Sequence, residues 1–479
     1  MVGIVVDQLR TDYLEQLQNY FGERGFKTLL REGAYLRDVD FKVPGLDAVN
    51  STAMIQTGAY PSLTGVPAEV VFDITSLSSR TKMPLVTTSG ATITNDSFSP
   101  APLRLSTIGD ELAIDTRGSA SVYSVAMDPQ QAVILAGHAG KGAYWINNTS
   151  GNWATSSYYG PLPTAISNRN MRNSLSHRVD TMQWRKYRFS RGDRDVYRKF
   201  AASPLGNREV TDVAIDLING LNLGSNAGST DMLNVAYTLA PYKYSTETSP
   251  QGEMQDAYRM LDAQIGRLIE AVDRRVGANN AVIWLTSTGY YHDALPVDDK
   301  YRLSGGEFSA KKAKSLLNSY LSAKYGNGSY IQAIREGQVF FDRKNLESLK
   351  TDPEKVIEEA RAFLVKMNGI AEAFTLNEII KPSTGELETL RLATDPKTSG
   401  EIILRFTPGV TVSYDETTPV KTEYIREASV MTPAIIRAPG LRPQILSTPV
   451  DAVQLAPTVA GQLRIRSPNG AKARPVPLN

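Results

Sequence analysis

The chain has 479 residues, of which 41% are hydrophobic and 21% charged, as in a soluble globular protein. Its net charge of +2 gives no overall field that would select nucleic acid or a membrane surface, and no apolar run approaches the roughly 18 residues of a transmembrane helix. Cysteine is absent, which excludes disulfides, thiolate catalysis and cysteine-based zinc sites. Histidine occurs only three times, at His138, His177 and His292.

The chain begins with a pattern of strand, turn and helix. Val2 to Val6 form a continuous apolar run, as in a strand covered on both faces, and apolar residues then recur at helical spacing from Tyr13 to Phe21. Further strands are expected at 232–240, 281–285 and 432–440, and further helices at 251–275 and 450–463. Strands that alternate with helices predict an α/β fold with a mostly parallel central sheet and helices on both faces.

Two long stretches interrupt this alternation. Residues 115–210 hold short strand-like pieces and turn clusters, including "NTSGN", which predicts a hairpin. Residues 295–425 predict helices at 309–324 and 353–367, and strands near 337–342 and 401–406. We interpret both stretches as insertions that cap the carboxyl edge of the sheet within a single domain spanning 1–479, since α/β proteins place their ligand crevice there.

The segment "AVIWLTSTGYY", residues 281–291, ends like the strand of an active site. An apolar run gives way abruptly to Thr286, Ser287, Thr288 and Gly289. None of these four residues holds a metal, carries a charge or acts as a base at neutral pH.

Segments along nearly the whole chain resemble the alkaline phosphatase superfamily, in particular its monomeric, phosphate-irrepressible bacterial branch. The matching segments include "GIVVDQLRTDYL", "IQTGAYPSLTG", "STIGDEL", "DMLNVAYT" and "VDAVQLAPTVAGQL". The resemblance implies an alkaline-phosphatase-like fold. It also implies hydrolysis of phosphate esters by two zinc ions and a threonine or serine nucleophile.

The residues at the positions implied for phosphate chemistry do not suit it. The nucleophile position falls on Ala48, which has no hydroxyl. The asparagine that cradles phosphate falls on Glu69, and the lysine and arginine that clamp phosphate fall on Asp128 and Gln130. A carboxylate at these places repels a phosphate dianion.

The implied zinc ligands are also replaced, apart from Asp7 at the end of the first strand. The aspartate and histidine that follow the second strand become Pro241 and Ser245, and the pair that follows the strand at 281–285 becomes Thr288 and Gly289. No histidine follows His292, so the last family ligand is missing as well. Asp7 is expected to accept backbone N–H groups or, alternatively, to hold one Mg²⁺ or Ca²⁺ with Asp47, Glu69 or Asp128.

From these replacements we expect a catalytically inactive relative, without a zinc site or other cofactor, that serves as a binding or scaffold subunit of a cell-envelope assembly. One alternative is a divergent metal-dependent phosphoesterase or sulfatase-like hydrolase with a rebuilt site. Another alternative is a glycan- or lipid-binding module that uses residues 168–200.

Residues 168–200 form the clearest basic cluster, with aromatic residues interleaved. We expect a docking surface for a protein partner, rather than for nucleic acid, at Trp184, Arg185, Lys186, Tyr187 and Arg188. The family resemblance implies export to the periplasm or cell envelope, with a signal peptide outside the numbered chain. Any membrane association is expected to run through a partner or a removed N-terminal anchor.

Overall fold

The computed structural model of the chain forms two compact units. The first consists of residues 1–69, 85–294 and 430–479, and the second of residues 70–84 and 295–429. The description covers residues 1–72, 98–226, 228–247, 249–292, 306–349, 351–414 and 430–479, with the backbone of 82–84 and 421–424.

A nine-stranded sheet forms the centre of the first unit, in the order β21-β2-β20-β12-β1-β11-β6-β7-β8. In chain order the strands are β1 (Val2–Asp7), β2 (Ala34–Leu36), β6 (Val122–Val125), β7 (Gly142–Ile146), β8 (Trp153–Ala154), β11 (Met232–Thr238), β12 (Ile283–Ser287), β20 (Ala434–Arg437) and β21 (Gln444–Leu446). The five neighbours β12, β1, β11, β6 and β7 are parallel. The predicted α/β class and mostly parallel sheet are therefore confirmed.

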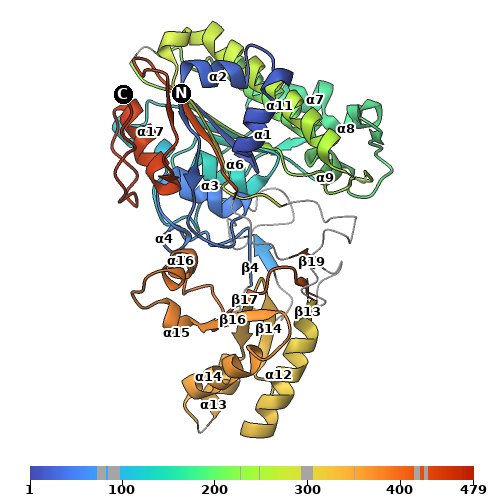
Figure 1. Ribbon diagram of the computed structural model, residues 1–479. Coiled ribbons are helices and arrows are strands. Elements are labelled where there is room, and N and C mark those ends of the chain that lie inside the picture. The colour runs from blue at the N-terminus through green and yellow to red at the C-terminus, as the bar shows by residue number, and fades with distance from the viewer. Residues whose placement is uncertain are drawn as a thin grey trace. The chain divides into compact units, whose positions relative to one another are not determined.

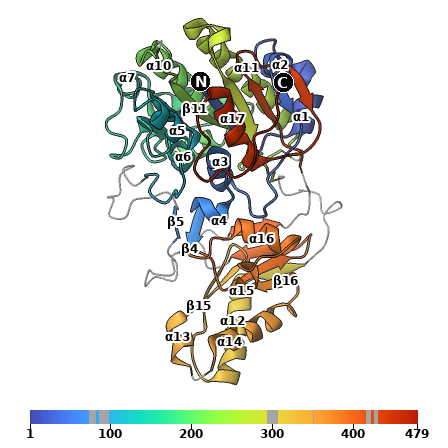
Figure 2. The same ribbon diagram turned by 90° about the vertical axis from the view of Figure 1, so that its left-hand side faces the viewer.

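Helices pack on the sheet in two groups (Figures 1 and 2). One group contains α3 (Ala48–Thr57), α5 (Ile108–Asp115), α6 (Pro129–Ala136) and α17 (Leu455–Leu463), and the other contains α2 (Phe26–Glu32), α7 (Thr164–Asn173), α9 (Val196–Ala201), α10 (Pro204–Gly220) and α11 (Gln251–Val276). Shorter elements are α1 (Thr11–Gln16), α4 (Pro61–Thr64), α8 (Leu175–Arg178) and the strand pairs β3 (Val39–Asp40) with β22 (Val450–Asp451) and β9 (Gln183–Trp184) with β10 (Tyr187–Arg188). The helix predicted over 251–275 is α11, which buries Met254, Tyr258, Leu261 and Ile265 along one face.

The second unit has sheets of its own. Its four-stranded antiparallel sheet has the order β14 (Ile331–Arg335), β15 (Gln338–Phe341), β17 (Ile402–Phe406) and β16 (Ile370–Thr375). The other strands are β13 (Glu307–Ser309), β18 (Thr411–Tyr414) and β19 (Lys421–Tyr424) in one sheet, and β4 (Val70–Phe72) and β5 (Lys82–Pro84) in another. The helices are α12 (Ala310–Tyr325), α13 (Arg343–Ser348), α14 (Pro353–Leu364), α15 (Leu376–Ile379) and α16 (Glu386–Ala393).

The local predictions inside both interruptions agree with this structure. "NTSGN" connects the antiparallel strands β7 and β8, and the helices and strands expected between 309 and 406 correspond to α12, α14, β15 and β17. Whether the two stretches act as caps over a crevice stays a prediction.

Candidate active site

The carboxyl end of β1 brings Asp7 between two neighbouring strands. Asp7 lies beside Thr238 of β11, and Val6 lies beside Ser287 of β12, so the residues that follow β12 reach the same sheet edge. The hydroxyls of Thr288 and Tyr290 both donate to Oδ1 of Asp7, over 2.9 and 2.7 Å. Asp7 was expected to accept hydrogen bonds from backbone N–H groups; the two bonds described at its carboxylate come from hydroxyl side chains.

The groups around Asp7 shift the pKa of its carboxyl in opposite directions. Burial raises the pKa of the Asp7 carboxyl, whereas the bonds from Tyr290 and Thr288 and the charge of Lys243 lower it. Thr288 also accepts a 3.0 Å bond from the backbone N–H of Gln8, which fixes its hydroxyl. Thr288 is fully buried, whereas the side chain of Tyr290 is partly exposed.

Asp47 caps the N-terminus of α3, directly before Ala48. Its Oδ1 accepts from the backbone N–H groups of Val49 and Asn50, both over 2.8 Å, and its Oδ2 accepts from the N–H of Glu69 over 2.6 Å. This capping explains why α3 begins at Ala48. Burial, together with the charge of Glu69, raises the pKa of Asp47 to about 6, although the backbone hydrogen bonds act to lower it.

Asp128 caps α6 in the same way and faces the same carboxylates. Its Oδ1 accepts from the N–H groups of Gln130 and Gln131, over 2.9 and 3.0 Å. Burial, with the charges of Glu69 and Asp47, raises the pKa of Asp128 to about 7. Gln130 donates from Nε2 to the carbonyl of Glu69 over 3.1 Å, so the positions predicted for the phosphate cradle and clamp do gather in one place.

The remaining predicted positions lie in two places, one beside Asp7 and one after β11. Gly289 shapes the turn that carries Tyr290 to Asp7, with a φ of 81°. Pro241 and Ser245 follow β11, where Ser245 Oγ lies 3.2 Å from the hydroxyl of Tyr187. Ser245 therefore belongs to the surroundings of the 183–188 hairpin.

The hairpin of the predicted docking surface turns its aromatic side chains inward. Trp184 is only 4% exposed and donates from Nε1 to Asp256 over 2.8 Å, and Tyr187 donates to Glu253 over 2.5 Å. Arg185, Lys186 and Arg188 are exposed. The prediction that Trp184 is exposed for docking is therefore wrong, because its indole is part of the core. Docking through the three basic residues stays a prediction.

Two of the three histidines have partners unrelated to Asp7, whereas the ring of His292 lies 5.0 Å from that of Tyr290. His138 places Nδ1 3.1 Å from Asp110 and Nε2 2.9 Å from the carbonyl of Leu103, and His177 lies in α8. In the described ranges no three or more histidine, aspartate or glutamate side chains are grouped so as to hold a metal ion. The residues that the structure describes therefore do not supply the donor groups of a two-zinc centre of the family type. That each altered position corresponds to a family ligand stays a prediction.

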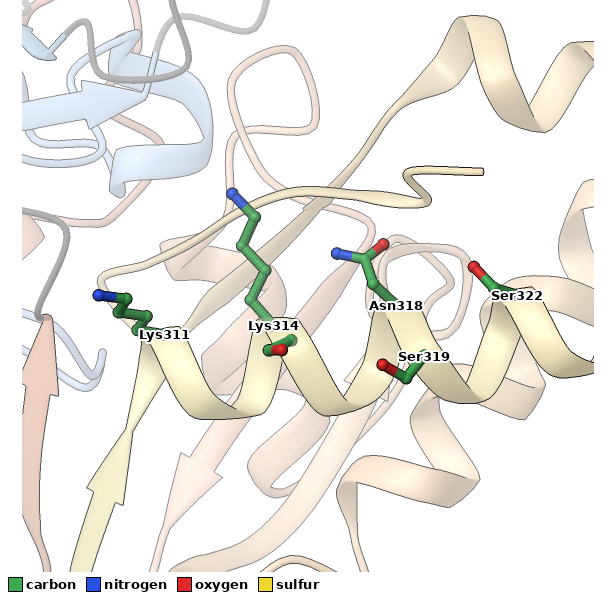
Figure 3. Close-up of a pocket in the computed structure, with 6 residues that line it drawn as sticks. Lys311, Lys314, Asn318, Ser319 and Ser322 are labelled. Carbon is green, nitrogen blue, oxygen red and sulfur yellow. The ribbon is translucent and has the colours of Figure 1, made fainter. Parts of the chain in front are cut away.

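A second depression lies along α12 in the second unit (Figure 3). It is lined by Lys311, Lys314, Ser315, Asn318, Ser319 and Ser322. Lys314 Nζ donates to the carbonyl of Gln332 over 2.8 Å, and Asn318 Oδ1 accepts from the N–H of Tyr330 over 2.7 Å. The six lining residues include no carboxylate or imidazole, so the sheet edge at Asp7 is the better candidate for catalysis.

This mostly parallel sheet, with buried carboxylates at its carboxyl edge, belongs to a known class of enzymes. The family model of type I phosphodiesterases and nucleotide pyrophosphatases matches residues 1–429, so the chain belongs to that family.

Bacterial alkaline phosphatases resemble the chain over nearly its whole length. Alkaline phosphatase PafA of Elizabethkingia meningoseptica is 26% identical and covers 99% of this chain and 93% of its own. Alkaline phosphatase PhoV of Synechococcus elongatus is 24% identical over 98% of this chain and 91% of its own. The crystal structure of wild-type PafA superposes with a TM-score of 0.83 at 25% identity, covering 99% of this chain and 98% of that one. The alkaline-phosphatase-like fold is confirmed.

These comparisons correct the expected function. The family model describes phosphodiesterases and pyrophosphatases, and the relatives are named as phosphatases, so the prediction of a non-catalytic scaffold subunit is wrong. No helix in the described part of the chain is both long enough and apolar enough to cross a bilayer.

Proposed function

We propose that the chain is a phosphoester hydrolase with a rebuilt site at the carboxyl edge of β1. Family membership supports the class of reaction. The observation that carries the proposal is the pair of hydroxyls that donate to one oxygen of Asp7. A hydroxyl bonded to a carboxylate is an arrangement of nucleophile and general base.

Tyr290 is the proposed nucleophile. Its oxygen attacks phosphorus while its proton passes to Asp7, and the bond from phosphorus to the leaving oxygen breaks. Burial and the charge of Asp7 raise the pKa of Tyr290, so the proton must move as the attack proceeds.

Asp128 is the proposed general acid. With a pKa of about 7 it is partly protonated at neutral pH, and it can give its proton to the leaving oxygen. Water then attacks the phosphotyrosine and loses a proton to Asp128, while Asp7 returns a proton to the Tyr290 oxygen. Each group ends the cycle as it began.

The charge of the residues near Asp47 and Asp128 favours phosphodiesters over monoesters. Asp47, Glu69 and Asp128 lie within electrostatic range of one another, while Lys243 is the cation whose charge acts on Asp7. A diester carries one negative charge at neutral pH and a monoester close to two, so the monoester meets the greater repulsion.

Turnover of bis(p-nitrophenyl) phosphate and p-nitrophenyl phosphate tests this function, with a chelator and with added Zn²⁺, Mg²⁺ or Mn²⁺. We expect the diester to be the better substrate, and Tyr290→Phe and Asp7→Asn to lower kcat by roughly 100-fold or more. Mass spectrometry of a quenched reaction should find phosphate on Tyr290.

Tyr20→Phe is the matched control, because Tyr20 is 53% exposed and lies outside the crevice. The control should keep full activity. No turnover of either ester in any of these conditions would contradict the hydrolase. Turnover that Tyr290→Phe leaves unchanged would contradict the phenol as nucleophile while leaving the hydrolase in place.

An exported location in the periplasm or cell envelope is supported by the family resemblance. Fractionation of the source cells, followed by immunoblotting, tests it: the protein should appear with periplasmic or envelope markers. Recovery with cytoplasmic markers alone would contradict this location.

A further inference from the structure

A small cavity lies where β11 ends, walled by the 183–188 hairpin and α11. Its lining includes Trp184, Tyr242 and Glu253, together with Thr238 and Ala240. The free volume, about 10 Å³, admits the centre of roughly one water-sized sphere. The cavity can therefore hold one small ion or one water molecule.

One carboxylate oxygen in the lining has no partner. Glu253 is 2% exposed; its Oε1 accepts the 2.5 Å bond from Tyr187, while its Oε2 has no hydrogen bond to any residue that the structure describes. A buried carboxylate oxygen without a partner is costly, on the order of several kcal/mol. A positively charged ligand next to Glu253 Oε2 would offset this cost.

Aromatic rings cluster beside the same cavity. The Trp184 and Tyr242 rings meet edge to face at 5.2 Å, and the Tyr187 and Tyr242 rings lie 4.9 Å apart. Ring faces attract cations through their quadrupole, and they repel anions. The lining thus combines a carboxylate with the aromatic surface that cation sites use.

Two neighbouring cationic side chains have other partners, although Lys186 Nζ also lies 5.8 Å from the centre of the Tyr187 ring. Lys186 pairs with Glu247 at 3.0 Å, and Arg185 donates to the carbonyl of Gly252 over 3.3 Å. The nearby indole N–H of Trp184 is bonded to Asp256. None of these contacts compensates Glu253 Oε2.

We infer that this cavity binds one monovalent cation of the size of ammonium or potassium, held by Glu253 and the rings of Trp184 and Tyr242. A single water molecule would give the oxygen a hydrogen bond but leave the carboxylate charge unpaired. Thr238, which lines the cavity, lies beside Asp7 in the sheet register, so the cavity is close to the proposed hydrolytic site. The cation is therefore either a free ion or the ammonium group of a substrate, and the second source rests on the proposed function.

Thermal unfolding in matched chloride salts tests the site without any measurement of activity. At constant ionic strength, the melting temperature should rise with the concentration of ammonium, potassium or ethylammonium chloride. It should not rise with tetramethylammonium chloride, whose cation is too large for the cavity. Preference for ethylammonium over ammonium and potassium would indicate a substrate group, and the reverse order a free ion.

Glu253→Gln should abolish the salt dependence, and Glu247→Gln, on the exposed side of the hairpin, should retain it. If Glu253→Gln does not fold, crystals of the unaltered protein soaked in rubidium or thallium salt provide the second test. Anomalous scattering should then mark the cavity. Absence of both the anomalous peak and the salt dependence would show that the cavity holds water only, and would overturn the cation site whether or not the protein hydrolyses phosphoesters.

Discussion

Asp128 shows how one carboxyl in an acidic crevice couples stability to pH. Its pKa is about 7 in the folded protein, against an unfolded value of 3.8. The folded state holds this proton more tightly than the unfolded state does. Protonated Asp128 therefore contributes its full share to the free energy of unfolding below pH 4, and this contribution is lost as the pH rises through 7. Asp128→Asn keeps an equally good helix cap and removes the charge. We therefore expect the free energy of unfolding of the variant to exceed that of the wild type by roughly 1–2 kcal/mol at pH 8. This is less than the full pKa shift implies, because solvent screens the charge of this partly exposed side chain.

Urea unfolding at pH 4 and pH 8 measures this effect. The advantage of Asp128→Asn should be small at pH 4 and should grow up to about pH 7. Asp352→Asn makes the same exchange at the N-cap of α14 in the second unit and should change little at either pH. An Asp128→Asn gain that is equal at both pH values would contradict the raised pKa of Asp128.

The same residues show what the sequence could and could not predict about the site. Asp7 was expected at a strand end, and the gathering of Glu69, Asp128 and Gln130 followed from their positions in the family pattern. The bond from Tyr290 to Asp7 could not be predicted, because it depends on the direction of the turn after β12. Trp184 was misjudged since its neighbours in sequence are basic, whereas its partner Asp256 is 72 residues away.

At the scale of the element, the turn after β12 depends on Gly289. Its φ of 81° is left-handed, and a Cβ atom there would lie 2.1 Å from Cδ2 of the Phe41 ring. Gly289→Ala therefore combines a left-handed alanine, about 1–2 kcal/mol, with a ring clash. We expect a loss of roughly 2–4 kcal/mol in the free energy of unfolding, measured in urea, and a displaced Tyr290 with reduced hydrolysis.

Gly440→Ala is the matched control for Gly289→Ala. Gly440 has the same φ of 81°, but no atom lies within 4 Å of the place of its Cβ. Only the backbone cost of about 1 kcal/mol should remain. Equal losses for the two variants would show that Phe41 gives way and that the turn does not depend on this close approach.

The regular elements were largely predictable from periodicity. The apolar run of β1 and the helical repeat of α11 each reflect a side-chain period that burial imposes. The antiparallel pairing of β20 with β12 could not be read in this way, because it depends on how the chain returns after a long insertion. Likewise β11 ends at Thr238, two residues before the predicted end, because the backbone of Thr238 exchanges hydrogen bonds with the side chain of Asn207.

At the scale of the whole molecule, each of the two units builds a hydrophobic core from its own described residues. The larger cluster contains residues of the first unit only, among them Leu268, and the other cluster contains residues of the second unit only, among them Leu321. The second unit interrupts the first in sequence, so its position in the chain gave no sign that it forms a core of its own. Proteins with two cores commonly depart from two-state unfolding.

We therefore expect two calorimetric transitions, each sensitive to one core. Leu321→Ala removes a fully buried side chain of α12 and should destabilise one transition by roughly 2–5 kcal/mol, and Leu268→Ala in α11 should do the same to the other. Leu316→Ala is the control, because Leu316 lies on α12 but is 53% exposed, and it should shift neither transition by more than about 0.5 kcal/mol. A single transition that both core variants shift would mean that the two cores unfold together, and would contradict their independence.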